Sequence, residues 1–212
     1  MTAQPMFPLQ SALLPGELLP LRIFEPRYSR LVADCLAMTD PAFGVVLITR
    51  GREVGGGYAR SEVGALARIT EHADHGMGRY QLKTVLGERI RVLEWLDDDP
   101  YPRAVIEPWP DEPGPPVTPE RIGEVVDKIL ALFERIVSSR GGQLRSDALA
   151  VEPEVAEDPS LHIYELATRV PMGQADRYAV LAAPTLSERV DVLTDAIETV
   201  TAMVEFQIAD EE

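Results

Sequence analysis

Lysine, histidine and cysteine are scarce in this sequence. Of the 20 basic residues only two are lysine, there are three histidines, and Cys35 is the single cysteine. One thiol cannot form an internal disulfide, which fits a reducing compartment. Cys35 falls on the apolar side of a predicted helix, a position that favours a buried core residue over a nucleophile. A serine–lysine dyad is also not expected, because neither lysine has a persuasive serine near it.

Long hydrophobic runs are missing as well. No window reaches the 18 or so uninterrupted apolar residues that a membrane span requires. The first 26 residues contain five prolines and no basic region, so they do not read as a signal peptide. These two absences predict a cytoplasmic protein that does not associate with membranes.

Basic residues are fewer than acidic ones, 20 against 35, which gives a formal net charge of −15. The first 115 residues carry 12 basic and 16 acidic side chains, and the last 97 carry 8 and 19. Such a chain repels phosphate backbones. We therefore expect no nucleic-acid partner.

Motifs of catalysis and metal binding are absent. The sequence has no phosphate-binding GxxxxGK[ST] loop, no GxSxG elbow, no HExxH and no CxxC pair. His72 and His75 lie three apart at a strand end, where they point to opposite faces. The Asp97–Asp99 run lacks the spacing of a calcium loop, and residues 55–57, three glycines, read as a flexible turn. We predict no metal, no cofactor and no catalytic residue.

A proline-rich segment divides the chain. Residues 108–116 contain five prolines, which forbid a helix and leave few donors for a sheet. The hydrophobic period is mostly two before this segment and close to 3.6 after it. We therefore predict two subdomains, residues 1–110 and 117–212.

The first subdomain reads as short strands around one helix. Residues 26–38 carry a helical apolar stripe that begins at Pro26, a residue suited to a first helical turn. The strands follow one another without helices between them, which favours an antiparallel barrel or sandwich. The predicted strands are 18–24, 43–49, 64–72, 79–86, 88–96 and 102–107.

The second subdomain reads as helices. A long helix begins after Thr118 and ends at Gly141-Gly142, and shorter ones are expected at 160–169 and 173–182. Thr185 and Glu188 form a capping box that opens a last helix with a heptad-like seam over 186–204. The seam is short, which favours an intramolecular bundle over a coiled coil. Residues 209–212 should fray. Eight apolar residues form the expected buried face of the first helix: Ile122, Val125, Val126, Ile129, Leu130, Phe133, Ile136 and Val137.

One segment is far more specific than these patterns. Residues 7–31, FPLQSALLPGELLPLRIFEPRYSRL, resemble the opening of the substrate-binding N-terminal domain of Lon-type ATP-dependent proteases. The similarity continues through FGVVLI, GALARI and GERIRVLEW, and residues 164–193 resemble the helical part that follows in that family. Only residues 111–158 match poorly. The sequence is most similar to stand-alone bacterial proteins made of this domain.

The resemblance implies an α+β fold, namely a PUA-like antiparallel β-barrel with one internal helix, followed by a C-terminal α-helical bundle. It implies recognition of unfolded or extended polypeptides, in company with a protease or chaperone. The ATPase and serine–lysine peptidase modules of Lon proteases are not in this sequence, so we expect a non-catalytic binding module and not an enzyme.

Four residues of the matching segment are candidates for substrate binding: Phe24, Pro26, Arg27 and Tyr28. The competing interpretation is that Phe24 and Tyr28 anchor the helix in the core, while Glu25 and Arg27 form a local ion pair. The apolar density of the segment favours that second interpretation.

Two other functions stay open on the sequence alone. The 186–204 face could make a homodimer or dock a partner without client binding. Alternatively, a deep polar pocket between barrel and bundle could bind a small molecule, which would require clustered carboxylates, or His72, with shifted pKa values.

Overall fold

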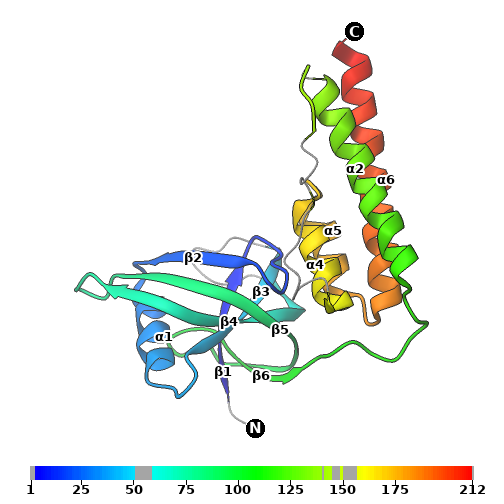
Figure 1. Ribbon diagram of the computed structural model, residues 1–212. Helices are drawn as coiled ribbons and strands as arrows, with labels where there is room; N and C mark the ends of the chain where they lie inside the picture. The colour runs from blue at the N-terminus through cyan, green and yellow to red at the C-terminus, as the bar shows by residue number, and fades with distance from the viewer. Residues whose placement is uncertain (1–2, 51–58, 140, 145–148, 150–156, 212) are drawn as a thin grey trace. The chain divides into compact units, whose positions relative to one another are not determined.

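The computed structural model describes residues 3–50, 59–139, 141–144, 149 and 157–211. The chain forms two compact units, Met1–Pro110 and Asp111–Glu212. Six strands and helix α1 make up the first unit, and four helices lie in the described part of the second (Figure 1). In these residues, no helix combines the length and the apolar composition that crossing a membrane requires. That the units are separately folding domains stays a prediction.

The first unit contains a six-stranded mixed sheet in the order β2-β5-β4-β3-β1-β6. The strands are β1 (Gln4–Leu9), β2 (Leu18–Ile23), β3 (Ala42–Arg50), β4 (Ala59–Asp74), β5 (Tyr80–Leu96) and β6 (Arg103–Pro108). The prediction of an antiparallel sheet is wrong at β1, which the sequence analysis missed and which runs parallel to β3. Parallel neighbours need a crossover, and β2 and helix α1 (Pro26–Leu36) supply it.

A single long strand replaces two predicted ones. Residues 79–86 and 88–96 were expected to be separate strands, but β5 continues through Gly87. Opposite this glycine the register of β4 and β5 shifts, between the pairs Ala65–Arg89 and Ala67–Leu86. A glycine inside a strand commonly marks such a bulge and not a turn.

The strand pairings return on themselves. Strand β6 pairs with both β1 and β5, so hydrogen bonds link β5, β4, β3, β1 and β6 in a ring. Strand β2 lies outside this ring and, within the described residues, pairs only with β5. One long side of β2 is therefore an edge.

Helix α1 packs its predicted stripe into the core of the first unit. Tyr28, Leu31, Val32 and Cys35 are buried. The Tyr28 ring lies 4.2 Å from that of Phe7, centroid to centroid, and Phe7 lies 5.8 Å from Phe43 on β3. This aromatic chain joins the helix to two strands, and Figure 1 shows α1 alongside the sheet.

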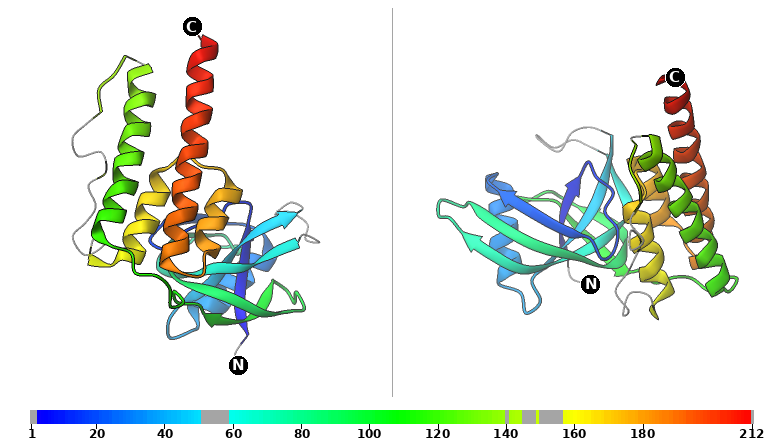
Figure 2. Two further views of the ribbon diagram at one scale, coloured as in Figure 1. Left: turned by 90° about the vertical axis from the view of Figure 1, so that its right-hand side faces the viewer. Right: turned by 45° about the horizontal axis from the view of Figure 1, so that its top comes forward.

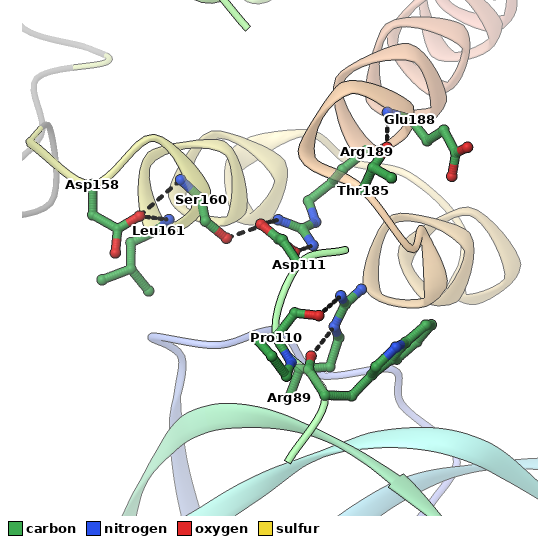
Figure 3. Close-up of polar contacts among 10 residues, drawn as sticks. Arg89, Pro110, Asp111, Asp158, Ser160, Leu161, Thr185, Glu188 and Arg189 are labelled. Atoms are coloured by element: carbon green, nitrogen blue, oxygen red, sulfur yellow. Dashed lines mark hydrogen bonds and ion pairs between the residues drawn. The ribbon is translucent and has the colours of Figure 1, made fainter. Parts of the chain in front are cut away.

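A buried arginine holds the last residues of the first unit. The Arg89 guanidinium donates from Nε to the carbonyl oxygen of Trp109 at 2.9 Å and lies 4.0 Å from the Trp109 ring centroid (Figure 3). It also donates to the carbonyl oxygen of Pro110 at 3.3 Å. Arg89 on β5 thus holds the chain where it leaves the sheet.

The second unit is built on two long helices, α2 (Pro119–Ser139) and α6 (Leu186–Glu211). Three ion pairs join them: Arg121–Asp191, Lys128–Glu198 and Arg135–Glu205. The partners advance by seven residues in both helices together, so α2 and α6 run in the same direction. A step of seven is the repeat that keeps one seam facing a partner helix.

The 186–204 seam is interior, as the intramolecular interpretation predicted. Leu193 and Ile197 on α6 are buried, as are Val125 and Ile129 on α2. The prediction that all eight apolar residues of α2 are buried is wrong. Leu132 is buried instead, and the other six are half-buried. The expected fraying at 209 is also wrong, since α6 continues to Glu211.

Two shorter helices, α4 (Pro159–Arg169) and α5 (Gln174–Ala182), pack against α6. Asp158 caps α4 by accepting from the backbone N–H of Ser160 at 2.9 Å. The C-terminal part of α6 extends beyond α4 and α5 (Figure 2). It is therefore covered by fewer helices than the rest of α6.

A buried arginine organises the second unit. Arg189 on α6 has no exposed side-chain surface, and it forms an ion pair with Asp111. The same guanidinium donates to Ser160 Oγ at 2.8 Å and lies 4.2 Å from the Tyr164 ring centroid (Figure 3). The backbone N–H of Glu112 donates to the carbonyl oxygen of Pro184 at 2.9 Å. The second unit thus starts at Asp111 and not at residue 117.

Replacing Asp111 tests this arrangement. Asp111→Ala leaves a fully buried guanidinium without its carboxylate, and breaking such a pair costs about 3 kcal/mol of unfolding free energy. That figure is the low end for buried pairs, because Asp111 itself is 26% exposed. Urea denaturation followed by far-UV circular dichroism measures the effect.

Glu205→Ala is the matched control. It removes an Arg–carboxylate pair of the same unit in which both side chains are about half exposed. Such pairs contribute less than about 1 kcal/mol. Equal losses in the two variants would contradict the role given to Arg189.

Candidate functional site

Large apolar side chains are exposed at one corner of the first unit. Phe24, between β2 and α1, is 71% exposed, and Met77, at the tip of the β4–β5 hairpin, is 94% exposed. Isolated apolar side chains on a surface are ordinary, but Phe24 also lines two adjoining hollows. We call the surface formed by Phe24 and these two hollows the Phe24 surface.

Local backbone constraints turn Phe24 outward. Its neighbour Ile23 ends β2 and is buried, which places Phe24 on the opposite face. Glu25 then takes the extended N-cap conformation, and Pro26 starts α1. The backbone N–H of Ser29 donates to the carbonyl oxygen of Glu25 at 2.9 Å, which closes the first turn. Phe24 has no neighbouring core into which to fold.

The larger hollow has a volume of about 640 Å³ and a basic lining. Its residues are Arg22, Ile23, Phe24, His75, Arg79, Tyr80 and Gln81. No carboxylate is among them. We call it the basic hollow.

The smaller hollow has a volume of about 190 Å³ and is mainly apolar. Its residues are Phe7, Pro8, Leu9, Leu21, Arg22, Ile23, Phe24, Glu25 and Tyr28. It shares Arg22, Ile23 and Phe24 with the basic hollow, so Phe24 lies where the two meet. We call it the apolar hollow.

The hairpin that borders the basic hollow is fixed by short-range bonds. The backbone N–H of His75 donates to the carbonyl oxygen of Arg79 at 2.9 Å. Met77 sits between two glycines with a φ of 56°. Ser29 on α1 donates from its hydroxyl to the carbonyl oxygen of Gly78. These contacts tie the hairpin tip to α1 and keep the lining residues in place.

The four predicted site residues have different positions. Phe24 and Tyr28 both line the apolar hollow, although Tyr28 is only 5% exposed. Arg27 forms an ion pair with Glu25 at 3.0 Å and lies 4.5 Å from the Tyr28 ring centroid. Pro26 begins the helix. The interpretation of Tyr28 as a core anchor and of Glu25–Arg27 as a local pair is therefore confirmed, and that of Phe24 as a core anchor is wrong.

Sequence reasoning missed Arg22 and Arg79 as lining residues. A lone arginine on a predicted strand, and another beside a turn, carry no motif. They come together because Arg22 pairs with Gln81 across β2 and β5, and Gln81 lies two residues after Arg79 on the same chain. That register could not be read from the pattern of either strand alone.

No metal centre forms around the histidines. Within the residues that the structure describes, no group of three His, Cys, Asp or Glu side chains could hold a metal ion. His72 lies within β4 and His75 in the exposed turn after it. The predicted glycine turn at 55–57 lies outside the described residues.

The groups with shifted pKa values do not form a catalytic apparatus. Burial, and then the nearby Asp34 carboxylate, raise the pKa of the Cys35 thiol to about 12. The Tyr101 hydroxyl donates to Asp34 at 2.7 Å, and burial followed by this bond raises its pKa to about 12. A nucleophilic cysteine requires the opposite shift. At the start of α2, backbone and side-chain hydrogen bonds lower the pKa of Glu120.

Comparison with known proteins gives concordant results. The family model of the ATP-dependent protease La (LON) substrate-binding domain matches residues 3–199. Lon protease 2 of Thermus thermophilus is 27% identical over 215 residues, which cover 96% of this chain and 25% of that protein. The Lon protease of Anaeromyxobacter dehalogenans is 32% identical over 105 residues, covering 49% of this chain and 12% of that protein. The chain thus spans a quarter or less of these curated relatives.

Two solved structures have the same fold. A Lon N-terminal domain protein from Xanthomonas campestris superposes with a TM-score of 0.63 and 24% identity, covering 92% of this chain and 98% of that one. The N-terminal domain of the Mycobacterium avium complex Lon protease gives 0.61 and 14%, covering 93% and 98%.

The state of Cys35 yields a prediction about reactivity. The pKa of about 12 makes the thiolate fraction at mildly alkaline pH about a thousandfold lower than in the unfolded chain. The Cys35 Sγ also donates to the carbonyl oxygen of Ala42 at 3.3 Å. A thiol-specific disulfide reagent should therefore react with the native protein only as fast as it unfolds, and at once in denaturant. Rapid reaction of the native protein would contradict this burial.

Proposed function

Because this chain belongs to the Lon substrate-binding domain family, we propose that it binds extended polypeptide segments without cleaving them. The observation that carries the proposal is the Phe24 surface, where an exposed aromatic ring separates two hollows. Concave apolar surface with a few polar groups is what a peptide side chain needs for burial. The proposal includes a cytoplasmic location and a protease or chaperone as the protein that receives the bound segment.

Binding uses side chains more than backbone. Strand β2 offers an edge next to Phe24, and an extended peptide could in principle add to it as a further strand. Pro20, in the middle of β2, has no N–H and interrupts such a ladder. The two hollows therefore supply the main binding energy in this proposal.

The fold proposal extends the ring of strand pairings. We take the linked strands β5, β4, β3, β1 and β6 as a PUA-like β-barrel, with β2 as a sixth strand attached to β5. This places the Phe24 surface at the one strand that the ring does not include. A client segment can approach it there without displacing another strand.

A second candidate function is docking of a partner, or a second copy, on the C-terminal part of α6. Met203 and Phe206 are 59% and 67% exposed, and a shallow hollow of about 510 Å³ lies beside them. Most of the predicted 186–204 face is turned inward, because Val190, Leu193, Ile197 and Val200 are buried and Leu186 and Val204 are half-buried.

Two matched variants separate the candidates. Phe24→Ala and Phe206→Ala each remove an aromatic ring that is about 70% exposed, so neither should affect folding by much. The client is fluorescently labelled casein, which is unfolded, and the readout is anisotropy. We expect Phe24→Ala to weaken binding about tenfold, since burying an aromatic ring contributes at least 1.4 kcal/mol. Phe206→Ala should bind as the wild type does.

If Phe206→Ala weakened casein binding and Phe24→Ala did not, the binding surface would be the C-terminal part of α6. Absence of casein binding by the wild type at high micromolar concentration would refute the peptide-binding proposal. Light scattering of the same samples reports whether Phe206 also holds two copies together.

A further inference from the structure

The basic hollow concentrates positive charge in an acidic chain. Arg22, His75 and Arg79 line it, whereas the formal net charge of the whole chain is −15. At physiological salt, charges more than about 8 Å apart are largely screened. A ligand in this hollow therefore experiences the local cations more than the net charge.

The two arginines have no carboxylate partner among the described residues. Several other cations of the first unit do form ion pairs, among them Arg27, Arg30, Arg60, Arg68 and Lys83. The acidic groups next to the hollow are already engaged. Glu25 pairs with Arg27, and the Asp74 carboxylate accepts from the backbone N–H of Gly76 at 2.7 Å. Arg22 and Arg79 are thus available to a ligand.

From this charge distribution we propose that the bound segment carries an Asp or Glu side chain close in sequence to a large apolar one. The inference rests on the proposed function and names the class of peptide. Guanidinium groups bind carboxylates through paired, charge-assisted hydrogen bonds. The rings of Phe24 and Tyr80 line the same hollow as these cations.

The adjacent hollows suggest how far apart the two side chains lie in the bound segment. The apolar hollow receives an apolar side chain, because its only acidic lining residue, Glu25, is paired with Arg27. The hollows meet at Phe24, so one extended segment that crosses this ring enters both. Side chains two residues apart in an extended chain point to the same side and lie about 7 Å apart. The simplest client therefore has an apolar and an acidic side chain separated by one residue.

The segment supplies its carboxylate from a side chain and not from its own end. A chain that occupies both hollows crosses Phe24 and continues on each side, so a free C-terminus is not required. Peptides with acetylated and amidated ends test this directly, because the Glu side chain is then the sole source of negative charge.

Three capped decapeptides of Gly and Ser form the probe, each with a Leu and, two residues later, Glu, Gln or Lys. We expect the Glu peptide to bind the wild-type chain about tenfold more tightly than the Gln peptide, and the Lys peptide to bind least. Fluorescence anisotropy at two salt concentrations measures the preference, which should shrink as salt rises.

Paired double variants identify the residues responsible. Arg22→Gln with Arg79→Gln should abolish the preference for Glu over Gln. Arg30→Gln with Lys83→Gln removes the same total charge from exposed positions outside the hollows, and should keep the preference.

Equal binding of the Glu and Gln peptides, or a preference that survives in the Arg22/Arg79 variant, would overturn the inference while casein binding still supports the proposed function. A preference lost equally in both double variants would also overturn it, since net charge alone would then be the cause. If neither casein nor any peptide binds, the proposed function itself fails.

Discussion

The contact between Tyr28 and Phe7 decides which side of the β2–α1 corner faces solvent. With their ring centroids 4.2 Å apart, the helix is fixed to β1 through its first turn. The helix then fixes the positions of Pro26 and Tyr28, and the sheet fixes that of Ile23. Phe24, between them, points to solvent. The exposed ring is therefore a consequence of core packing, and its exposure needs no flexible loop.

Part of this could be read from the sequence. The 3.6-residue period of Tyr28, Leu31, Val32 and Cys35 predicted α1 and its buried face, because one side of this helix packs against the core. Strand β1 was not predicted. Its two prolines disfavour a strand interior, yet the segment pairs in parallel with β3 and, over a short stretch, antiparallel with β6. The basic hollow was not predictable, since Arg22 and Arg79 meet only through the register of β2 on β5.

Arginine has two distinct uses in this acidic chain. Arg89 and Arg189 are buried. Arg89 donates to carbonyl oxygens at the end of the first unit, and Arg189 pairs with Asp111 at the start of the second. Their planar, multiply donating groups suit such positions better than lysine. Arg22 and Arg79 are exposed and line the basic hollow, and they have no carboxylate partner among the described residues.

The parallel course of α2 and α6 has a consequence for how the chain is made. Each ion pair between them joins residues 70 positions apart, so the apolar face of α2 is synthesised long before its cover. The entropy cost of closing so long a loop arises before the contacts between α2 and α6 can stabilise the chain. Pairing of the two helices is therefore slower than the formation of either helix. On a ribosome, the nascent chain therefore exposes the apolar stripe of α2 until the residues of α6 that cover it have been synthesised.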